Sequence, residues 1–490
     1  MSFKRIGLYL GPTVFFLILL FFNPADLNAA SKGVLASILW IAIWWITEAL
    51  PISVTAMLPM ILFPLTGGME LADTTASFGH KLVFLTMGGF MIAIAIEKWN
   101  LHKRIALNII YLIGTDIRKI ILGFMLSTAF LSMWISNTAT SVMMLPIGIV
   151  IIKQLKDNSE GSGDKSNTFA KALMLSIAYS ASIGGISTLI GTPTNMVMAG
   201  AISQIYGYEI SFIDWFIFGF PLSMLLLFIS WFYLTRITFS LKEISFTRGR
   251  EEISQLRREL GSFTYEQKVV SFVFVAAAFC WITKNFLLKN IFPNIDDTII
   301  AIFFATILFM INTKDKKGKI LKWKDTLNLP WGVLLLLGSG MSFAKAVDSS
   351  GLSIWVGNQI SVFGTMNLFL LIILLVTVVN FLTEIASNMA TIAMMLPILA
   401  PICLEFDLHP FVLMVAASVS ASCAFMLPVA TPPNAVVFGS GYLKMPDMVK
   451  KGFLLNVTSI IIITVMVYFL LPILWELVPD QFPKGLISLN

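Results

Sequence analysis

The sequence predicts an all-α polytopic membrane protein, built from two inverted repeats with re-entrant hairpins and discontinuous helices. Three observations carry this prediction: a charge-poor composition, a duplicated pair of polar motifs inside apolar runs, and the placement of basic residues. The 490 residues are 57% hydrophobic and 12% charged, with a mean hydropathy of +0.86. Because soluble globular proteins carry roughly 25% charged residues, a water-soluble fold is excluded and a multi-pass membrane protein is expected.

The apolar runs set the expected membrane spans, which need roughly 20 residues each. Residues 6–22 are interpreted as an uncleaved first helix, since this run exceeds the h-region of a signal peptide, about 7–15 residues. Further continuous runs lie at 34–63, 82–97, 214–238, 268–286, 297–312, 331–347 and 453–475. Three more runs are interrupted by polar residues, at 120–152, 170–206 and 366–443.

The interrupted runs contain an internal repeat. Residues 136–147 read SNTATSVMMLPI and residues 387–398 read SNMATIAMMLPI, with nine of the twelve positions identical. Downstream, GTPTN at 191–195 is matched by ATPPN at 430–434. A polar segment at 156–168, expected to be a surface loop, accounts for the longer spacing in the first half. Two ordered copies of two motifs indicate a duplicated architecture.

The basic residues give the two repeats opposite directions. The basic segment 98–119 follows the helix at 82–97, whereas the basic segment 313–329 precedes its counterpart at 331–347. If both segments are cytoplasmic, one helix ends on that side and the other begins there. The repeats are therefore expected to be inverted, as in many secondary transporters.

The motifs themselves predict a binding site within the membrane. Each SNx tripeptide separates two apolar arms, which indicates a hairpin whose tip lies at membrane depth, where backbone that is not helical must line a cavity or bind a ligand. Each TPxN segment places proline inside an apolar run, so the helix should break there and expose its ends. Two short breaks of this kind in inverted halves are typical of transporter sites.

The expected site is nearly free of charge. Residues 120–152, 172–208 and 408–443 contain no Asp, Glu, Lys or Arg, so hydroxyl, amide and carbonyl oxygens must provide the chemistry. These oxygens suit Na⁺, and an anion bound together with Na⁺ would be neutralised. Four ionisable residues at the ends of apolar runs are interpreted as interfacial anchors: Glu48, Glu97, Lys345 and Glu384.

At these motifs, and at WWITEALP (residues 44–51), the chain resembles the divalent anion/sodium symporter family over almost its whole length. The resemblance implies an elevator-type transporter of di- and tricarboxylates (succinate, malate, fumarate, 2-oxoglutarate or citrate) coupled to Na⁺. It also implies a homodimer in the plasma (inner) membrane, surrounded by lipid and without a nucleic-acid partner. Each protomer would divide into scaffold parts, 1–119 and 240–365, and transport-domain halves, 120–239 and 366–490.

The resemblance also implies roles for individual residues. The first sodium site would comprise Ser132, Ser136, Asn137 and Gly191. The second would comprise Thr383, Ser387, Asn388 and Ala430. Substrate would contact Asn137, Thr138, Thr192, Pro193, Asn388, Met389, Thr431 and Pro432. Met389 stands where bacterial relatives often have threonine.

Other functions stay open on the sequence. A sodium-independent dicarboxylate exchanger is the main alternative, and the hydroxyls of Ser132 and Thr383 favour sodium coupling over it. An intramembrane enzyme is disfavoured because the sequence offers no nucleophile–base pair or metal motif. A channel would not need two discontinuous inverted halves.

Overall fold

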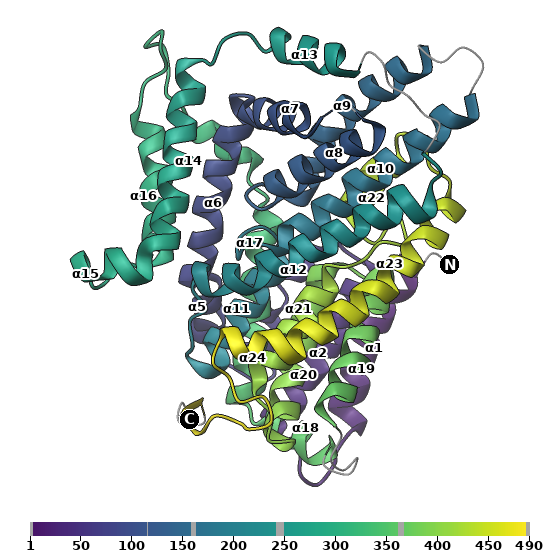
Figure 1. The fold of residues 1–490 in the computed structure, drawn as a ribbon. Coiled ribbons are helices and arrows are strands. Elements are labelled where there is room, and N and C mark those ends of the chain that lie inside the picture. The colour runs from purple at the N-terminus through teal and green to yellow at the C-terminus, as the bar shows by residue number, and fades with distance from the viewer. Residues whose placement is uncertain (1–2, 115, 158–162, 242–248, 361–366, 487–490) are drawn as a thin grey trace.

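The computed structural model describes residues 3–114, 116–157, 163–241, 249–360 and 367–486, and within these ranges the fold is helical (Figure 1). Ten of the described helices are long and apolar enough to cross a membrane. The first half of the chain contains α1 (Phe3–Phe21), α2 (Ala29–Thr47), α3 (Ile52–Thr55), α4 (Pro59–Leu65), α5 (Leu71–Phe78), α6 (Lys81–Lys98), α7 (Leu101–Ile113), α8 (Ile117–Ser132), α9 (Asn137–Asp157), α10 (Gly163–Ile186), α11 (Pro193–Tyr206) and α12 (Phe212–Phe232).

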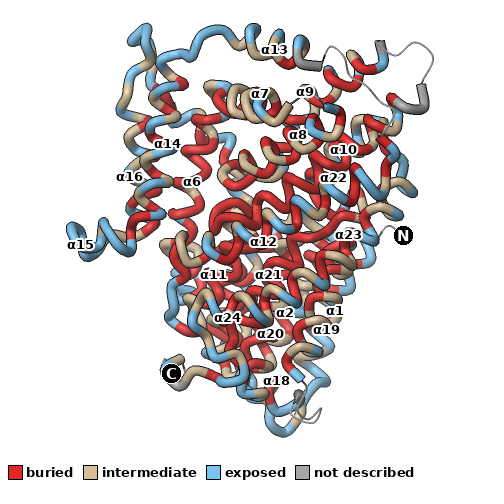
Figure 2. The backbone as a smooth tube through the Cα atoms, viewed as in Figure 1, coloured by how far each residue is buried: buried red, intermediate tan, exposed pale blue. Residues whose placement is uncertain are grey.

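The second half begins after a π-helical turn at Tyr233–Thr238. It contains α13 (Gly249–Glu259), α14 (Tyr265–Thr283), α15 (Lys289–Ile291), α16 (Asp297–Met310), α17 (Trp331–Ser349), α18 (Leu352–Ile360), α19 (Leu368–Ile385), α20 (Asn388–Glu405), α21 (Pro410–Ala421), α22 (Pro432–Phe438), α23 (Met445–Val465) and α24 (Leu471–Leu474). Figure 2 shows buried residues concentrated along α10 and α21, whereas α14 and α16 at the edge carry many exposed ones.

The helices break where the two motifs lie. The chain leaves helical structure between α8 and α9 and between α19 and α20, directly at the SNx tripeptides. It breaks again between α10 and α11 and between α21 and α22, and the second helix of each pair begins at the proline of TPxN. Proline suits this first position because its missing N–H would have no helical partner there. Both hairpins and both discontinuous helices were predicted, and the fold confirms them.

The two basic segments lie at the same end of the molecule. Lys98, the last residue of α6, forms an ion pair of 2.7 Å with Asp325, which precedes α17. The Lys98 amino group and the Trp99 indole N–H also donate to the Ile320 carbonyl, at 3.0 and 2.9 Å. Helix α6 therefore ends where α17 begins, and Figure 1 places the α8–α9 and α19–α20 hairpins in opposite halves of the view. This arrangement confirms the inverted repeats.

The common location of the basic segments gives a topology prediction. Single cysteines introduced in 101–113 and in 313–322 should both react with a membrane-impermeant maleimide only from the cytoplasmic side, because basic loops are retained there. Labelling is compared between intact cells and inside-out vesicles. A cysteine at Lys289, beyond the far end of α14, is the control that should be labelled from the opposite side. Labelling of the two segments from different sides would contradict the assignment.

Two local expectations were wrong. The run 34–63 is not one helix: α2 ends at Thr47, Glu48 adopts a left-handed conformation (φ 46°), and Pro51 precedes the short α3. The segment 156–168 is not a continuous loop, since α9 extends to Asp157 and α10 begins at Gly163. The intervening residues 158–162 lie outside the described part of the chain.

Candidate functional site

A cavity of about 1280 Å³ lies between the two hairpin tips and the two helix breaks. All eight residues expected to contact substrate line it: Asn137, Thr138, Thr192, Pro193, Asn388, Met389, Thr431 and Pro432. Six of the eight residues expected to hold sodium line it: Asn137 and Asn388, which are in both sets, and Ser136, Gly191, Ser387 and Ala430. Segments separated by about half the chain thus meet around one space, as the duplicated motifs predicted.

At the first hairpin tip, three oxygen atoms converge with one proton between them. The Ser132 hydroxyl is buried and lies 2.6 Å from the Asn137 side-chain carbonyl and 2.6 Å from the Ala181 backbone carbonyl. A serine hydroxyl has a single proton and can donate to only one of these acceptors. The cluster therefore has an acceptor oxygen left over, next to the cavity.

The second tip repeats this geometry. The buried Thr383 hydroxyl lies 2.7 Å from the Asn388 side-chain carbonyl and 2.9 Å from the Ala421 backbone carbonyl. Ser132 and Thr383 each stand four residues before the SNx serine, so the repeat places them equivalently. Neither lines the cavity directly, and both lie behind the asparagine of their tip.

The asparagine of each TPxN motif holds the unwound segment before it. The Asn195 amide group donates to the Thr188 and Ile186 carbonyls, at 2.9 and 3.3 Å. The Asn434 amide donates to the Leu427 and Ala424 carbonyls, at 3.0 and 3.1 Å. Both side chains are fully buried. Sequence reasoning found the motif but gave these asparagines no role, although their identity in both copies was an available signal.

Glu384 was expected to be an interfacial anchor, and this interpretation was wrong. Its carboxylate is only 3% exposed and accepts hydrogen bonds from the backbone N–H groups of residues 425, 426 and 427, at 2.8, 2.9 and 2.9 Å. The Asn456 amide donates a fourth bond of 2.7 Å. A buried carboxylate is stable here because the helix break after α21 leaves these N–H groups without helical partners. The equivalent position of the first repeat is Met133, so comparing the repeats could not reveal it.

The charged residues of the cavity stand at its rim. Lys4, Glu48 and Glu97 are the charged side chains among its described lining residues, and Lys4 pairs with Glu48 at 3.2 Å with both side chains exposed. Asn328, in the basic segment before α17, also lines the cavity, so the space extends toward the end of the molecule that carries the basic segments. Lys345 does not contribute, because it pairs with Asp73 at 2.8 Å elsewhere.

The motifs, the inverted halves and the cavity agree with a comparison of the sequence with known families. Residues 4–477 match the family described as the sodium:sulfate symporter transmembrane region. The chain belongs to this family. The match spans nearly all the described helices, so the resemblance expected from the motifs is confirmed and the chain is a multi-pass membrane protein of a transporter family.

Relatives named as sodium-dependent dicarboxylate transporters align with most of the chain. It is 44% identical to the sodium-dependent dicarboxylate transporter SdcS of Staphylococcus saprophyticus and 46% identical to SdcS of Staphylococcus aureus strain USA300. Each alignment covers 96% of this chain and 92% of the relative.

Solved transporter structures share the fold at low sequence identity. MtrF of Neisseria gonorrhoeae superposes with a TM-score of 0.58 at 13% identity, covering 95% of both chains. The YdaH transporter of Alcanivorax borkumensis superposes with a TM-score of 0.57 at 12% identity, covering 81% of this chain and 87% of that one. These similarities support the helical membrane architecture and extend to the fold alone.

Proposed function

We propose that the chain is a secondary active transporter that carries a dicarboxylate across the plasma membrane together with Na⁺. The observation that carries the proposal is the pair of equivalent oxygen clusters at Ser132 and Thr383, which flank a cavity whose inner walls carry no charge. The names of the SdcS relatives, at 44–46% identity, support both the substrate class and the coupling ion.

The sodium sites follow from the surplus of acceptors at each tip. Na⁺ binding would satisfy the carbonyl oxygen that the hydroxyl proton cannot reach, and hydroxyl, amide and backbone oxygens are suitable ligands for such a hard cation. Ser132, Ser136, Asn137 and Gly191 would hold one ion. Thr383, Ser387, Asn388 and Ala430 would hold the other. Two ions beside the uncharged inner walls of the cavity would then provide the positive charge that a dianion needs, which makes binding of substrate depend on sodium.

The substrate contacts follow from the same geometry. Because Oδ1 of Asn137 and of Asn388 faces the hydroxyl behind it, the amide Nδ2 of each tip is left to donate to a carboxylate. Thr138, Thr192 and Pro193 line the first side of the cavity, and Met389, Thr431 and Pro432 line the second. A molecule with one carboxylate for each side matches this two-fold arrangement.

Met389 gives a prediction about substrate affinity. Met389 lines the cavity and is half-buried, so Met389→Thr should restore the hydroxyl that Thr138 supplies on the other side. A hydrogen bond to a charged group contributes about 1.5–3 kcal/mol, which sets an upper range of roughly 10- to 150-fold tighter succinate binding. Calorimetric titration with succinate at fixed Na⁺ measures it. Met395→Thr, in the same helix but outside the cavity lining, is the control for lost packing. Unchanged or weaker succinate binding by Met389→Thr alone would contradict the proposed contact between residue 389 and the substrate.

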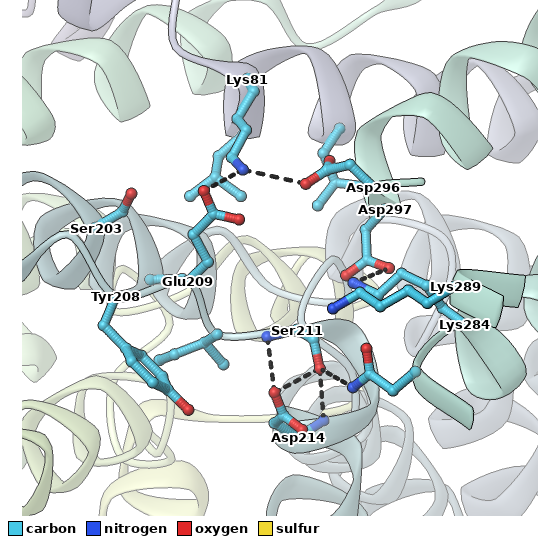
Figure 3. Close-up of a pocket in the computed structure, with 15 residues that line it drawn as sticks. Lys81, Ser203, Tyr208, Glu209, Ser211, Asp214, Lys284, Lys289, Asp296 and Asp297 are labelled. Atoms are coloured by element: carbon cyan, nitrogen blue, oxygen red, sulfur yellow. Dashed lines mark hydrogen bonds and ion pairs between the residues drawn. The ribbon is translucent and has the colours of Figure 1, made fainter. Parts of the chain in front are cut away.

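We propose an elevator movement because both hairpin tips and both helix breaks belong to one set of segments, separate from the rest of the chain. Residues 120–239 and 366–490, which hold both tips and both breaks, would move as the transport domain against a scaffold of 1–119 and 240–365. Figure 3 shows a charged cluster where these parts meet, around a cavity of about 270 Å³. There the loop before α12 contacts the scaffold: Glu209 pairs with Lys81, and the Phe212 N–H donates to Asp297 at 2.9 Å.

The same cluster supports an inward-facing assignment of the structure. Lys81 begins α6, whereas Lys98 ends it at the basic segments, so the cluster lies at the end of α6 opposite to the basic segments. Asp297 also forms a buried ion pair of 2.8 Å with Lys284. With basic segments in the cytoplasm, the cavity faces inward, and the Glu209 and Phe212 contacts are ones that an outward displacement of the transport domain would break.

Reconstitution in liposomes tests the proposed function. Proteoliposomes loaded with succinate should exchange it for external radiolabelled succinate in Na⁺ and lose this activity when Na⁺ is replaced by choline on both sides. Undiminished counterflow without Na⁺ would show the exchanger instead.

We further propose that the transporter is a homodimer, which light scattering on the detergent-solubilised protein measures directly.

A further inference from the structure

A second large groove, of about 1040 Å³, lies away from the substrate cavity and shares no lining residue with it. Its walls come from the end of α6, the start of α14 and the loop after α16. The Lys98–Asp325 ion pair places it at the end of the molecule that carries the basic segments. The proposed transport cycle assigns no task to this groove.

The groove is strongly basic. Six lysines line it, against two carboxylates, Glu266 and Asp315: Lys98, Lys268, Lys314, Lys317, Lys319 and Lys322. Two of the amino groups are engaged, since Lys98 pairs with Asp325 and the Lys319 amino group donates to the Met310 carbonyl at 2.7 Å.

The remaining four amino groups, on Lys268, Lys314, Lys317 and Lys322, form no ion pair with any residue in the described ranges. The two carboxylates are partly engaged with backbone N–H groups. Glu266 accepts from the Lys314 N–H at 2.9 Å, and Asp315 accepts from the Lys317 N–H at 3.1 Å. The groove therefore offers several uncommitted cationic donors to an anion.

The groove adjoins the outward apolar surface of the helices below it. Phe272 and Phe279 of α14 and Phe303 of α16 are 74%, 56% and 58% exposed, and Figure 2 shows these helices at the edge of the molecule. Met310, whose carbonyl holds Lys319, is the last residue of α16. The lysines thus stand where an exposed apolar surface ends.

Exposed aromatic residues lie close to the lysines, near the end of this apolar surface. Trp323 is 72% exposed just beyond the loop, and Tyr265 at the start of α14 is 42% exposed. Trp and Tyr are enriched at the boundary between hydrocarbon and water. Basic pockets at the cytoplasmic ends of membrane helices suit anionic lipid headgroups.

We propose that this groove binds the phosphate headgroup of an anionic phospholipid, with the acyl chains lying along α14 and α16. Lys268, Lys314, Lys317 and Lys322 hold the phosphate, and the exposed phenylalanines contact the chains. The proposal rests on the membrane placement and not on the identity of the transported substrate. A soluble phosphate has the same headgroup chemistry but lacks the acyl chains, and the experiment separates the two.

The experiment counts bound lipid on the full-length protein by native mass spectrometry. Protein is reconstituted in nanodiscs of phosphatidylcholine with one-fifth phosphatidylglycerol, then released into detergent. Wild type should retain phosphatidylglycerol selectively, and Lys314→Gln/Lys317→Gln/Lys322→Gln should weaken this retention at least tenfold, since it removes three of the four amino groups that hold the phosphate. Lys103→Gln/Lys119→Gln/Lys450→Gln, at exposed lysines outside the groove, is the charge-matched control and should retain it.

Three outcomes would overturn the proposal. The first is equal retention by the groove variant and wild type. The second is equal loss by the control variant, which would show a non-specific charge effect. The third is displacement of the lipid by millimolar inorganic phosphate together with saturable phosphate binding in lipid-free detergent, which would identify a soluble anion as the occupant. If the triple variant is not monodisperse, Lys268→Gln/Lys317→Gln is measured in its place under the same criteria.

Discussion

Asn137→Ala and Asn388→Ala should each abolish sodium-dependent uptake of succinate while the folded protein remains. Each asparagine contributes the carbonyl oxygen that meets Ser132 or Thr383, at 2.6 and 2.7 Å, and the amide that faces the substrate in the proposed binding mode. Removing it leaves a sodium site without a ligand and a substrate carboxylate without a donor. Loss of one hydrogen bond to a charged group costs about 1.5–3 kcal/mol, and the two losses act together, so we expect uptake below a hundredth of wild type.

Uptake into proteoliposomes under an inward Na⁺ gradient measures the effect. Asn290→Ala is the matched control, because Asn290 is exposed and, among the described residues, its side chain donates within its own helical turn, to the Phe286 carbonyl. Size-exclusion profiles show that the variants are folded. Normal transport by either tip variant would contradict the proposed site.

Glu384→Gln should strongly weaken sodium binding at the second tip. Both carboxylate oxygens accept backbone N–H groups of the unwound segment, including the Leu427 N–H at 2.9 Å. Glutamine replaces one of these oxygens with an NH₂ group, so a donor would face a donor. The segment leading to Ala430 should then shift, and we expect the apparent affinity for Na⁺ to fall by tenfold or more, given about 1.5–3 kcal/mol for a charge-assisted bond.

The sodium dependence of uptake tests this, together with the melting temperature. Glu405→Gln, at an exposed carboxylate that ends α20, should change neither. A lower melting temperature with an unchanged sodium dependence would show that Glu384 supports folding alone and does not position the sodium site.

The duplicated motifs account for how much of the site could be predicted. SNTATSVMMLPI and its copy indicated where both hairpin tips lie, and the prolines at 193 and 432 marked the first residues of the second half-helices. A repeat reveals residues that are alike in both halves. Glu384 has no counterpart, since Met133 occupies the equivalent position, and its partners at 425–427 become available only when the helix breaks in three dimensions.

Local geometry explains the other differences between sequence and structure. Apolar composition alone could not show that α2 ends at Thr47, because the break at Glu48 depends on a left-handed backbone conformation followed by Pro51. The charged cluster around Lys81 and Glu209 could not be predicted from the sequence either. Its members come from segments that are distant in the chain and meet only through packing of the two proposed domains.

Equilibrium binding of radioactive sodium to the purified protein, without substrate, tests the central claim most directly. Paired oxygen clusters predict saturable Na⁺ binding by wild type, with one class of site lost in Ser132→Ala and the other lost in Thr383→Ala. Each single variant should keep the binding that the opposite tip provides, and the double variant should keep none at these tips. Undiminished Na⁺ binding by the double variant, or none by wild type, would contradict the account.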